Sequence, residues 1–386
     1  MADPAGAIAA RLSLFFAATF AVIGLRTPYW PLWLEGRGLG PGEIGLVLAV
    51  GSWMQVAAAP WVASRVDRRG ERRRVLVILA TAATLGYASF ALADGLVAIL
   101  CIAAFTAACF TPVIPLGDNL AMIAVARHGV DYGRARLWGS ITFIAASSIG
   151  GVAIAGVSER VLWLMIAAVA MVALAAAALP DLRTTRQRQP GKGMRLLLGD
   201  RRFATFLVAG ACLQASHAMV YGFGTIHWQS AGNGPAIVGL LWAEAVLVEI
   251  VFFAYGRHAL RRAGPAGLLA LGGIAGILRW PALAASADPW VLVLTQPLHA
   301  LTFGAAHLGA MSFIAAAVAP ERSATAQSLY SAVASGIAFG IAMPLAGRLY
   351  GAFGGTAFLA MALLSAIGLA GAVMLSRGAP APIARS

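Results

Sequence analysis

Two histidines stand in the stretch LHALTFGAAH, residues 298–307, where nearly every other residue is apolar or small. An imidazole changes its charge near neutral pH and can also bind a metal ion. On a regular helix His299 and His307 would lie about 80° and about 12 Å apart, which is too far to share one metal ion. The spacing therefore excludes a histidine-pair metal site and leaves proton exchange or hydrogen bonding between helices as the chemistry of these rings.

Further ionisable side chains lie in equally apolar stretches: Arg26, Asp118, Arg136, His217, His227, Glu244, Glu249 and Arg279. A charge inside a membrane is costly, so such residues usually face a cavity or a partner.

The permanently charged guanidinium of Arg26, with its five donors, suits a carboxylate or phosphate and favours an organic acid as ligand. An ion pair of Arg26 with Asp118 or Glu249 is the alternative.

The composition places these residues in a membrane protein. Of the 386 residues, 60% are hydrophobic and only 11% are charged, whereas soluble domains have about a quarter charged residues. Apolar runs of roughly 20 residues, enough to cross a bilayer, recur along the chain. They predict an all-α membrane protein with twelve transmembrane helices, near 11–34, 43–65, 75–93, 96–125, 137–156, 161–179, 203–228, 236–256, 266–286, 289–318, 324–350 and 354–376.

The basic residues predict the orientation. If the N-terminus is cytoplasmic, 23 of the 28 Lys and Arg residues fall in cytoplasmic segments, which is a strong positive-inside bias. Both termini are therefore expected in the cytoplasm. The net charge of +13 is read as a topology signal and a contact with anionic lipid, and not as a nucleic-acid surface.

The chain divides into two halves around a polar segment, 180–202, which we interpret as a cytoplasmic linker between a six-helix bundle at 1–179 and another at 203–386. Shifting the sequence by 194 positions aligns Gly45 with Gly239, Arg68 with Arg262 and Gly70 with Gly264. Two six-helix repeats of this kind would place a substrate site at the bilayer midplane between the halves.

The loop ASRVDRRGERRR resembles the loop motif of the major facilitator superfamily. Asp67, Arg68, Gly70, Arg72 and Arg73 match that motif, and Ala63 replaces its leading glycine. The resemblance implies a conformational latch, formed by a carboxylate at the end of the second helix together with basic groups. A solvated charge run that only sets the topology is the alternative.

Five further stretches resemble the branch of that superfamily that contains lactose permease and phenylpropionate-type permeases: TPYWPLWL, YGRARLWGS, SHAMVYGF, ILRW and LHALTFGAAH. The resemblance implies that Asp118 and Arg136 either contact substrate or form a structural pair. Phe143 stands where the permease stacks a tryptophan on sugar, and Gln55 and His217 are expected to contact substrate as well.

The same resemblance implies that Glu249, Arg279 and His299 couple transport to protons. Thr302 stands where lactose permease carries its proton-binding glutamate, and a threonine cannot titrate. The proton carrier is therefore expected to be Glu249 or His299.

Four tryptophans, Trp30, Trp33, Trp228 and Trp290, lie near predicted helix ends on the outer side. Tryptophan is enriched at membrane interfaces. We therefore expect these four to form an interfacial belt.

Together these features predict a monomeric secondary transporter in a bacterial inner membrane, working by alternating access. Its partners would be a small-molecule substrate, protons and membrane lipid, with no cofactor and no metal. Proton symport of a small organic solute is favoured, with an aromatic or other carboxylic acid as the candidate substrate. Proton-antiport export, symport of a sugar or nucleoside, and a membrane-embedded enzyme or scaffold are the alternatives. An enzyme is disfavoured, because the sequence has no metal-ligand cluster, no nucleophile paired with a base and no complete phosphate loop around GKG at 191–193.

Overall fold

The computed structural model describes residues 4–183 and 192–377, so the part of the predicted linker at 184–191 lies outside the described residues. The described chain is almost entirely helical. Its α-helices up to the linker are α1 (Pro4–Gly36), α2 (Pro41–Arg69), α3 (Arg72–Ser89), α4 (Gly95–Phe110), α5 (Val113–His128), α6 (Tyr132–Ile154) and α7 (Glu159–Ala178).

The α-helices after the linker are α8 (Lys192–Gly199), α9 (Arg201–Ala215), α10 (Thr225–Ser230), α11 (Pro235–Ala254), α12 (Gly256–Ala285), α13 (Pro289–Thr295), α14 (Ala306–Ala317), α15 (Pro320–Ser331), α16 (Phe339–Phe353) and α17 (Phe358–Arg377). Short π segments interrupt the helical runs at Val220–Gly224, Ala300–Ala305 and Ala332–Ala338. A 3-10 segment at Gln296–Leu298 follows α13.

Eleven helical stretches within the described residues are long and apolar enough to cross a membrane. The last of them, Pro320–Arg377, has 58 residues, which is more than twice the roughly 20 that a bilayer needs. Gly354, with φ 54° and ψ −136°, ends α16 inside this stretch. The stretch therefore holds two crossings, and the prediction of twelve transmembrane helices is confirmed.

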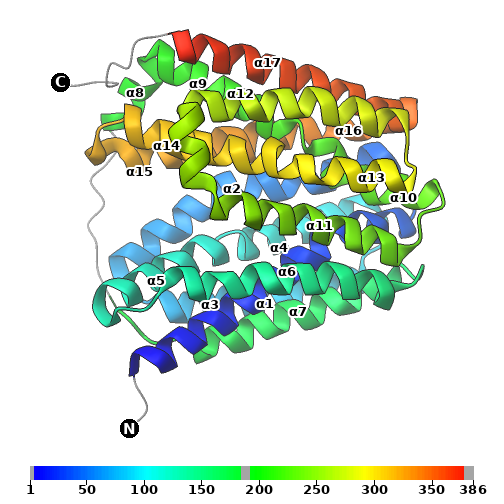
Figure 1. Cartoon of the computed structure of the whole chain (residues 1–386). Coiled ribbons are helices and arrows are strands. Elements are labelled where there is room, and N and C mark those ends of the chain that lie inside the picture. The colour runs from blue at the N-terminus through cyan, green and yellow to red at the C-terminus, as the bar shows by residue number, and fades with distance from the viewer. Residues whose placement is uncertain (1–3, 184–191, 378–386) are drawn as a thin grey trace. The chain divides into compact units, whose positions relative to one another are not determined.

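Contacts between α-carbons divide the chain into two compact units. The first is Met1–Gln189 with Gly234–Ala243, and the second is Pro190–Asn233 with Glu244–Ser386. In the first unit α1 packs along α6 and α7 (Figure 1). The hydroxyl of Tyr29 on α1 donates a hydrogen bond to the carbonyl of Ser147 on α6 at 2.5 Å, so the two helices are joined at their point of contact.

A closer approach of α1 to α6 occurs at Gly24. A Cβ atom added there would lie only 2.7 Å from the carbonyl oxygen of Phe143 and 3.1 Å from the Cβ of Ala146. Because the obstructing atom is backbone, it cannot turn aside as a flexible side chain would. Glycine at this position sets the spacing of the two helices.

The tryptophan belt that the sequence suggested is wrong for three of its four members. Trp30, Trp33 and Trp228 are 4%, 0% and 1% exposed, whereas Trp290 is 77% exposed. The rings of Trp30 and Trp33 stack at 4.7 Å, and the ring of Phe90 meets Trp30 edge-on at 5.0 Å. The segment that carries Phe90 covers this end of α1, so the rings belong to the protein core.

In the second unit α12 packs against α17 and α14. The run from α13 to α14 departs from regular helix, since His299 lies between the 3-10 segment and the π segment. The rings of His299, Phe303 and His307 stack in one column, with centroids 5.5 and 6.0 Å apart. The separation of about 80° expected between the histidines assumed a uniform helix, and the wider turn of a π segment removes it.

Prediction for the helix contact. Replacing Gly24 with alanine should lower the free energy of unfolding by about 1–3 kcal/mol, because the added methyl group meets backbone in a packed contact. Thermal unfolding of the purified protein in detergent measures the loss. Gly199→Ala is the matched control, since nothing lies within 4 Å of a Cβ at that position. Equal stability of Gly24→Ala and the control would contradict the close approach.

Candidate functional site

The guanidinium of Arg279 on α12 is the centre of a buried polar cluster in the second unit. Arg279 is 1% exposed. Its Nη2 donates to Oε1 of Gln296 at 2.9 Å, and its Nη1 donates to Nδ1 of His299 and to Oγ1 of Thr302, both at 3.2 Å. The guanidinium also lies 4.9 Å from the centre of the Trp280 ring. All these partners are neutral or aromatic groups, and none is a carboxylate.

The contact with Arg279 fixes the tautomer of His299. Arginine can only donate hydrogen bonds, so Nδ1 of His299 must accept, and the ring proton of the neutral imidazole is on Nε2. That nitrogen lies 3.6 Å from Oε2 of Glu249 on α11. Arg279 therefore directs the N–H of His299 toward the carboxylate.

The hydroxyl of Thr302 extends the cluster to His217. Nδ1 of His217 is 3.1 Å from the carbonyl oxygen of Leu213, and a carbonyl can only accept, so this nitrogen is protonated. Nε2 of the neutral ring is then the acceptor for the Thr302 hydroxyl at 3.1 Å. Thr302 thus accepts from Arg279 and donates to His217, which joins Arg279, Gln296, His299, Thr302 and His217 into one directed network.

Glu249 is the most accessible titratable member of this cluster. Its side chain is 18% exposed, compared with 7% for that of His299. His217 is 1% exposed.

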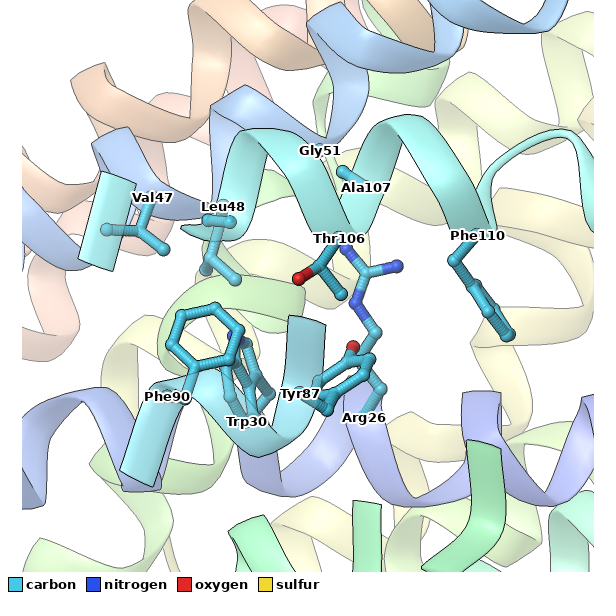
Figure 2. A pocket seen from close by; sticks show the side chains of 11 residues that line it. Arg26, Trp30, Val47, Leu48, Gly51, Tyr87, Phe90, Thr106, Ala107 and Phe110 are labelled. Carbon is cyan, nitrogen blue, oxygen red and sulfur yellow. The ribbon is translucent and has the colours of Figure 1, made fainter. Parts of the chain in front are cut away.

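The first unit holds a second candidate site around Arg26, shown in Figure 2. The guanidinium of this half-buried residue reaches from α1 toward α4. The hollow is lined by residues of α1 to α4 and the segment between α3 and α4: Arg26, Trp30, Val47, Leu48, Gly51, Tyr87, Phe90, Ala103, Thr106, Ala107 and Phe110. Among the described residues of its own unit, Arg26 forms no ion pair with a carboxylate, so the alternative of a pair with Asp118 is not formed.

Two features of this hollow concern its polar groups. A Cβ at Gly51 would lie 2.9 Å from Nη2 of Arg26, so the missing side chain leaves room for the guanidinium. The hydroxyl of Thr106 is buried and has no hydrogen-bond partner among the described residues. The hollow therefore combines a positive charge and an unused hydroxyl with the aromatic rings of Trp30 and Phe90.

Asp118 and Arg136, also in the first unit, do not form a contact ion pair in the described part of the chain. Oδ1 of Asp118 accepts a hydrogen bond from the hydroxyl of Tyr132 at 3.0 Å. The guanidinium of Arg136 lies over the ring of Phe20 on α1, 3.7 Å from its centre. Tyr132 also interacts with Arg136, so this tyrosine links the two charged groups, which attract one another without direct contact.

Two other predicted substrate contacts in this unit have different surroundings. Phe143 is 8% exposed and belongs to the α1–α6 contact through its carbonyl group. Gln55 is half-buried on α2. Neither residue lines the hollow at Arg26.

The predicted latch begins at a left-handed turn. Gly70 ends α2 with φ 72°, and its N–H donates to the carbonyl of Val66 at 2.7 Å. Arg72 is 3% exposed, and its Nε donates to Oδ1 of Asn119 on α5 at 2.5 Å. Arg68 is exposed, and the side chain of Asp67 lies outside the described residues. The hydrogen bond of Arg72 therefore connects the start of α3 to Asn119 on α5, the residue after Asp118.

The sequence signalled some of these residues and missed others. Glu249, Arg279 and His299 were expected together and lie in one cluster, and His217, expected at the substrate, lies beside them. Gln296 and Thr302 were missed as members of the cluster, although both are polar residues inside a predicted crossing, three positions on either side of His299. Tyr132, Tyr87 and Thr106 were missed as well. Uncharged polar residues are common in membrane helices, so their presence alone does not indicate a site.

Twelve crossings with ionisable groups inside both units are typical of multi-pass membrane transporters. Residues 9–360 match the model of a protein family described as "MFS_1 like family". The chain is 33% identical over 359 residues to a protein of Escherichia coli K12 called "Probable 3-phenylpropionic acid transporter", covering 92% of this chain and 94% of that one. It is 28% identical over 337 residues to the maltose permease of Geobacillus stearothermophilus, covering 84% and 83%.

Solved structures show the same fold. The nucleoside transporter NupG matches with a TM-score of 0.85 and 17% identity, over 96% of this chain and 99% of that one. An inward-facing bacterial homologue of the human lysosomal transporter Spinster matches with a TM-score of 0.76 and 13% identity, over 98% of each chain. The chain belongs to the MFS_1-like family and is a transporter of the major facilitator superfamily, which confirms the resemblance seen in its sequence.

Prediction for the buried cluster. Thr302→Val keeps the shape of the side chain but removes the hydroxyl that joins Arg279 to His217. Because buried donors and acceptors then lose a partner, the free energy of unfolding should fall by about 1–3 kcal/mol. Thermal unfolding measures this, with Thr205→Val as control, since that exposed hydroxyl bonds only to the carbonyl of Arg201 in its own helix. If the two variants unfold at the same temperature, the network does not contribute to stability.

Proposed function

We propose that the protein is a secondary active transporter that couples the movement of protons to the uptake of a small aromatic carboxylate by alternating access. The observation that carries the proposal is Arg26, a guanidinium without a carboxylate partner among the described residues, in a hollow lined by aromatic rings. A guanidinium matches the geometry of a carboxylate and can bind it through two parallel hydrogen bonds. The relative in E. coli, named for 3-phenylpropionic acid, supports this substrate class.

The lining of the hollow suits the two ends of such a substrate. Arg26 and the unpartnered hydroxyl of Thr106 would hold the carboxylate oxygens. Trp30, Phe90 and Phe110 offer ring faces and edges to the phenyl group. Aromatic pairs in offset or edge-on geometry add about 0.5–1.5 kcal/mol each beyond the apolar area that they bury. Carboxylate and ring would therefore be recognised separately.

The hollow is narrow as it stands. Its free space is about 20 Å³, which holds little more than one water molecule. An aromatic acid must therefore displace lining side chains as it binds, and the long, flexible side chain of Arg26 is the one best able to move. Substrate would accordingly bind in another conformation of the transport cycle, as alternating access requires.

For the proton, the directed network favours Glu249 over His299 as the carrier. Nδ1 of His299 accepts from Arg279, so a second proton on the imidazole would break that hydrogen bond and place two donors face to face. Glu249 can take up a proton without disturbing any contact of Arg279. Protonation would end the attraction between its carboxylate and the N–H of His299 at 3.6 Å, and this change of contact is proposed to bias the conformational equilibrium.

We further propose that the orientation follows the positive-inside bias, with both termini in the cytoplasm and the protein in a bacterial inner membrane. Asp118 and Arg136 are proposed as further polar contacts of the substrate, since their mutual ion pair is absent from the described residues. The Gly70–Arg72 turn is proposed as the latch, through the hydrogen bond of Arg72 to Asn119.

Prediction for substrate binding. Arg26→Gln should weaken binding of 3-phenylpropionate about 10- to 150-fold, because a hydrogen bond to a charged group contributes about 1.5–3 kcal/mol. Isothermal titration of the purified protein measures the affinity. The neutral amide 3-phenylpropionamide should bind wild type and variant with equal, low affinity, since it lacks the charge that Arg26 recognises.

Thr84→Val is the matched control for a second variant, Thr106→Val. The hydroxyl of Thr84 bonds to the carbonyl of Ala80 in its own helix at 2.8 Å, so its loss should leave the affinity unchanged while Thr106→Val lowers it.

Unaltered 3-phenylpropionate binding in Arg26→Gln would remove this hollow from the substrate site. Preferential binding of maltose or of a nucleoside in the same assay would replace the proposed substrate class.

Prediction for proton coupling. Glu249→Gln should abolish uptake driven by an imposed pH gradient in proteoliposomes, while exchange of labelled for unlabelled substrate at equal concentrations persists, because the amide keeps the shape but cannot carry a proton. Glu244→Gln is the control, since Glu244 lies five residues earlier on α11, about 140° around the helix. Gradient-driven uptake that survives in Glu249→Gln would assign the proton to another group.

A further inference from the structure

A groove runs between the last turns of α2 and the first turns of α3. It is lined by residues of these two helices and by Glu71 between them: Trp61, Val62, Arg65, Val66, Arg69, Glu71, Arg74, Val75, Ile78 and Leu79. Its free volume is about 210 Å³, ten times that of the hollow at Arg26. It shares no lining residue with the buried cluster or the hollow, and its residues flank the Gly70 turn that is proposed as the latch.

The floor of the groove is apolar. Val62 and Val66 are 7% and 1% exposed and form its base, whereas Trp61 and Ile78 are 61% and 55% exposed on its sides. Two large apolar side chains left open beside a recess offer contact to another apolar molecule.

The polarity of the groove changes along its length. On α2, Trp61, Arg65 and Arg69 follow one another at intervals of four residues, so they share one face of the helix. On α3, Arg74 and Ile78 are spaced in the same way. On both helices the charged residues lie toward the Gly70 turn and the apolar ones lie away from it, so the groove has a basic end and an apolar end.

The basic end carries an excess of positive charge. Its only acidic lining residue, Glu71, pairs with Arg74 at 3.4 Å, so Arg65 and Arg69 add two further charges. The guanidinium of Arg65 lies 4.8 Å from the centre of the Trp61 ring. A guanidinium stacked in this way keeps the N–H groups along its edge available for an oxyanion.

We propose that this groove binds one anionic phospholipid, with the phosphate between Arg65 and Arg69 and an acyl chain beside Trp61 and Ile78. Charge complementarity selects an anionic headgroup, and the position of the arginines at the ends of two membrane crossings places them at headgroup level. The proposal rests on the chain crossing a membrane and is independent of the substrate. Failure of the carboxylate binding experiment would leave it standing.

The test counts bound lipid by native mass spectrometry of the full chain, titrated in detergent with phosphatidylglycerol or with zwitterionic phosphatidylcholine. Wild type should bind one phosphatidylglycerol molecule in preference to phosphatidylcholine. The double variant Arg65→Gln, Arg69→Gln should bind it about 25-fold more weakly, at about five-fold for each arginine near a lipid surface. Arg134→Gln is the control, since that side chain is 90% exposed and pairs with Asp131 outside the groove.

A second measurement avoids dependence on the folding of the double variant. Phosphatidylglycerol with brominated acyl chains should quench part of the fluorescence of the ten tryptophans, and Trp61→Phe should lose that part. Glycerol phosphate, which has the headgroup charge without acyl chains, should not displace the lipid. Equal affinity for the two lipids, equal affinity in wild type and the double variant, or quenching unchanged in Trp61→Phe would each overturn the proposal.

Discussion

A guanidinium with almost no access to solvent dictates the arrangement of the second unit. Arg279 is 1% exposed, and a buried charge is tolerated only where hydrogen bonds replace its hydration. Its acceptors are Gln296, His299 and Thr302, all from the run that joins α13 to α14. Arg279 thereby determines the tautomer of His299. The carbonyl of Leu213 determines the tautomer of His217, and with it the direction of the Thr302 hydroxyl.

The irregular turns of that run give the acceptors their places. The 3-10 segment at Gln296–Leu298 and the π segment at Ala300–Ala305 flank His299 on either side. π turns are concentrated at functional sites, and here the turn also stacks Phe303 between the two histidine rings. The backbone therefore departs from regular helix where the polar groups converge, and a further π segment at Val220–Gly224 follows His217.

Helix number and type were predictable because the length of an apolar run is set by bilayer thickness. The grouping of Glu249, Arg279 and His299 was predictable from buried charge and resemblance. The roles of Thr302 and Gln296 were not, since neutral polar side chains in a crossing carry no sign of which partner they meet. Trp30 was misplaced because an amphipathic ring near a helix end looks the same in sequence whether lipid or Phe90 covers it.

The charges of Arg279 and Arg26 suggest why the proposed transport reaction would move one proton with one substrate carboxylate. Arg279 is hydrogen-bonded by neutral groups, so Glu249, beyond His299, supplies the nearest balancing charge in its cluster. Arg26 has no carboxylate within 4 Å in the described chain and would be balanced by the carboxylate of the substrate.

A proton on Glu249 adds one positive charge, and a substrate carboxylate at Arg26 adds one negative charge. When both are bound the carrier has the same net charge as when both sites are empty, so loaded and empty forms would cross between conformations against the same electrostatic cost. Under this proposal, binding either ligand alone would change the net charge by one unit in a medium where uncompensated charge is expensive. Movement of the half-loaded carrier would then be disfavoured, and this would couple the proton to the acid.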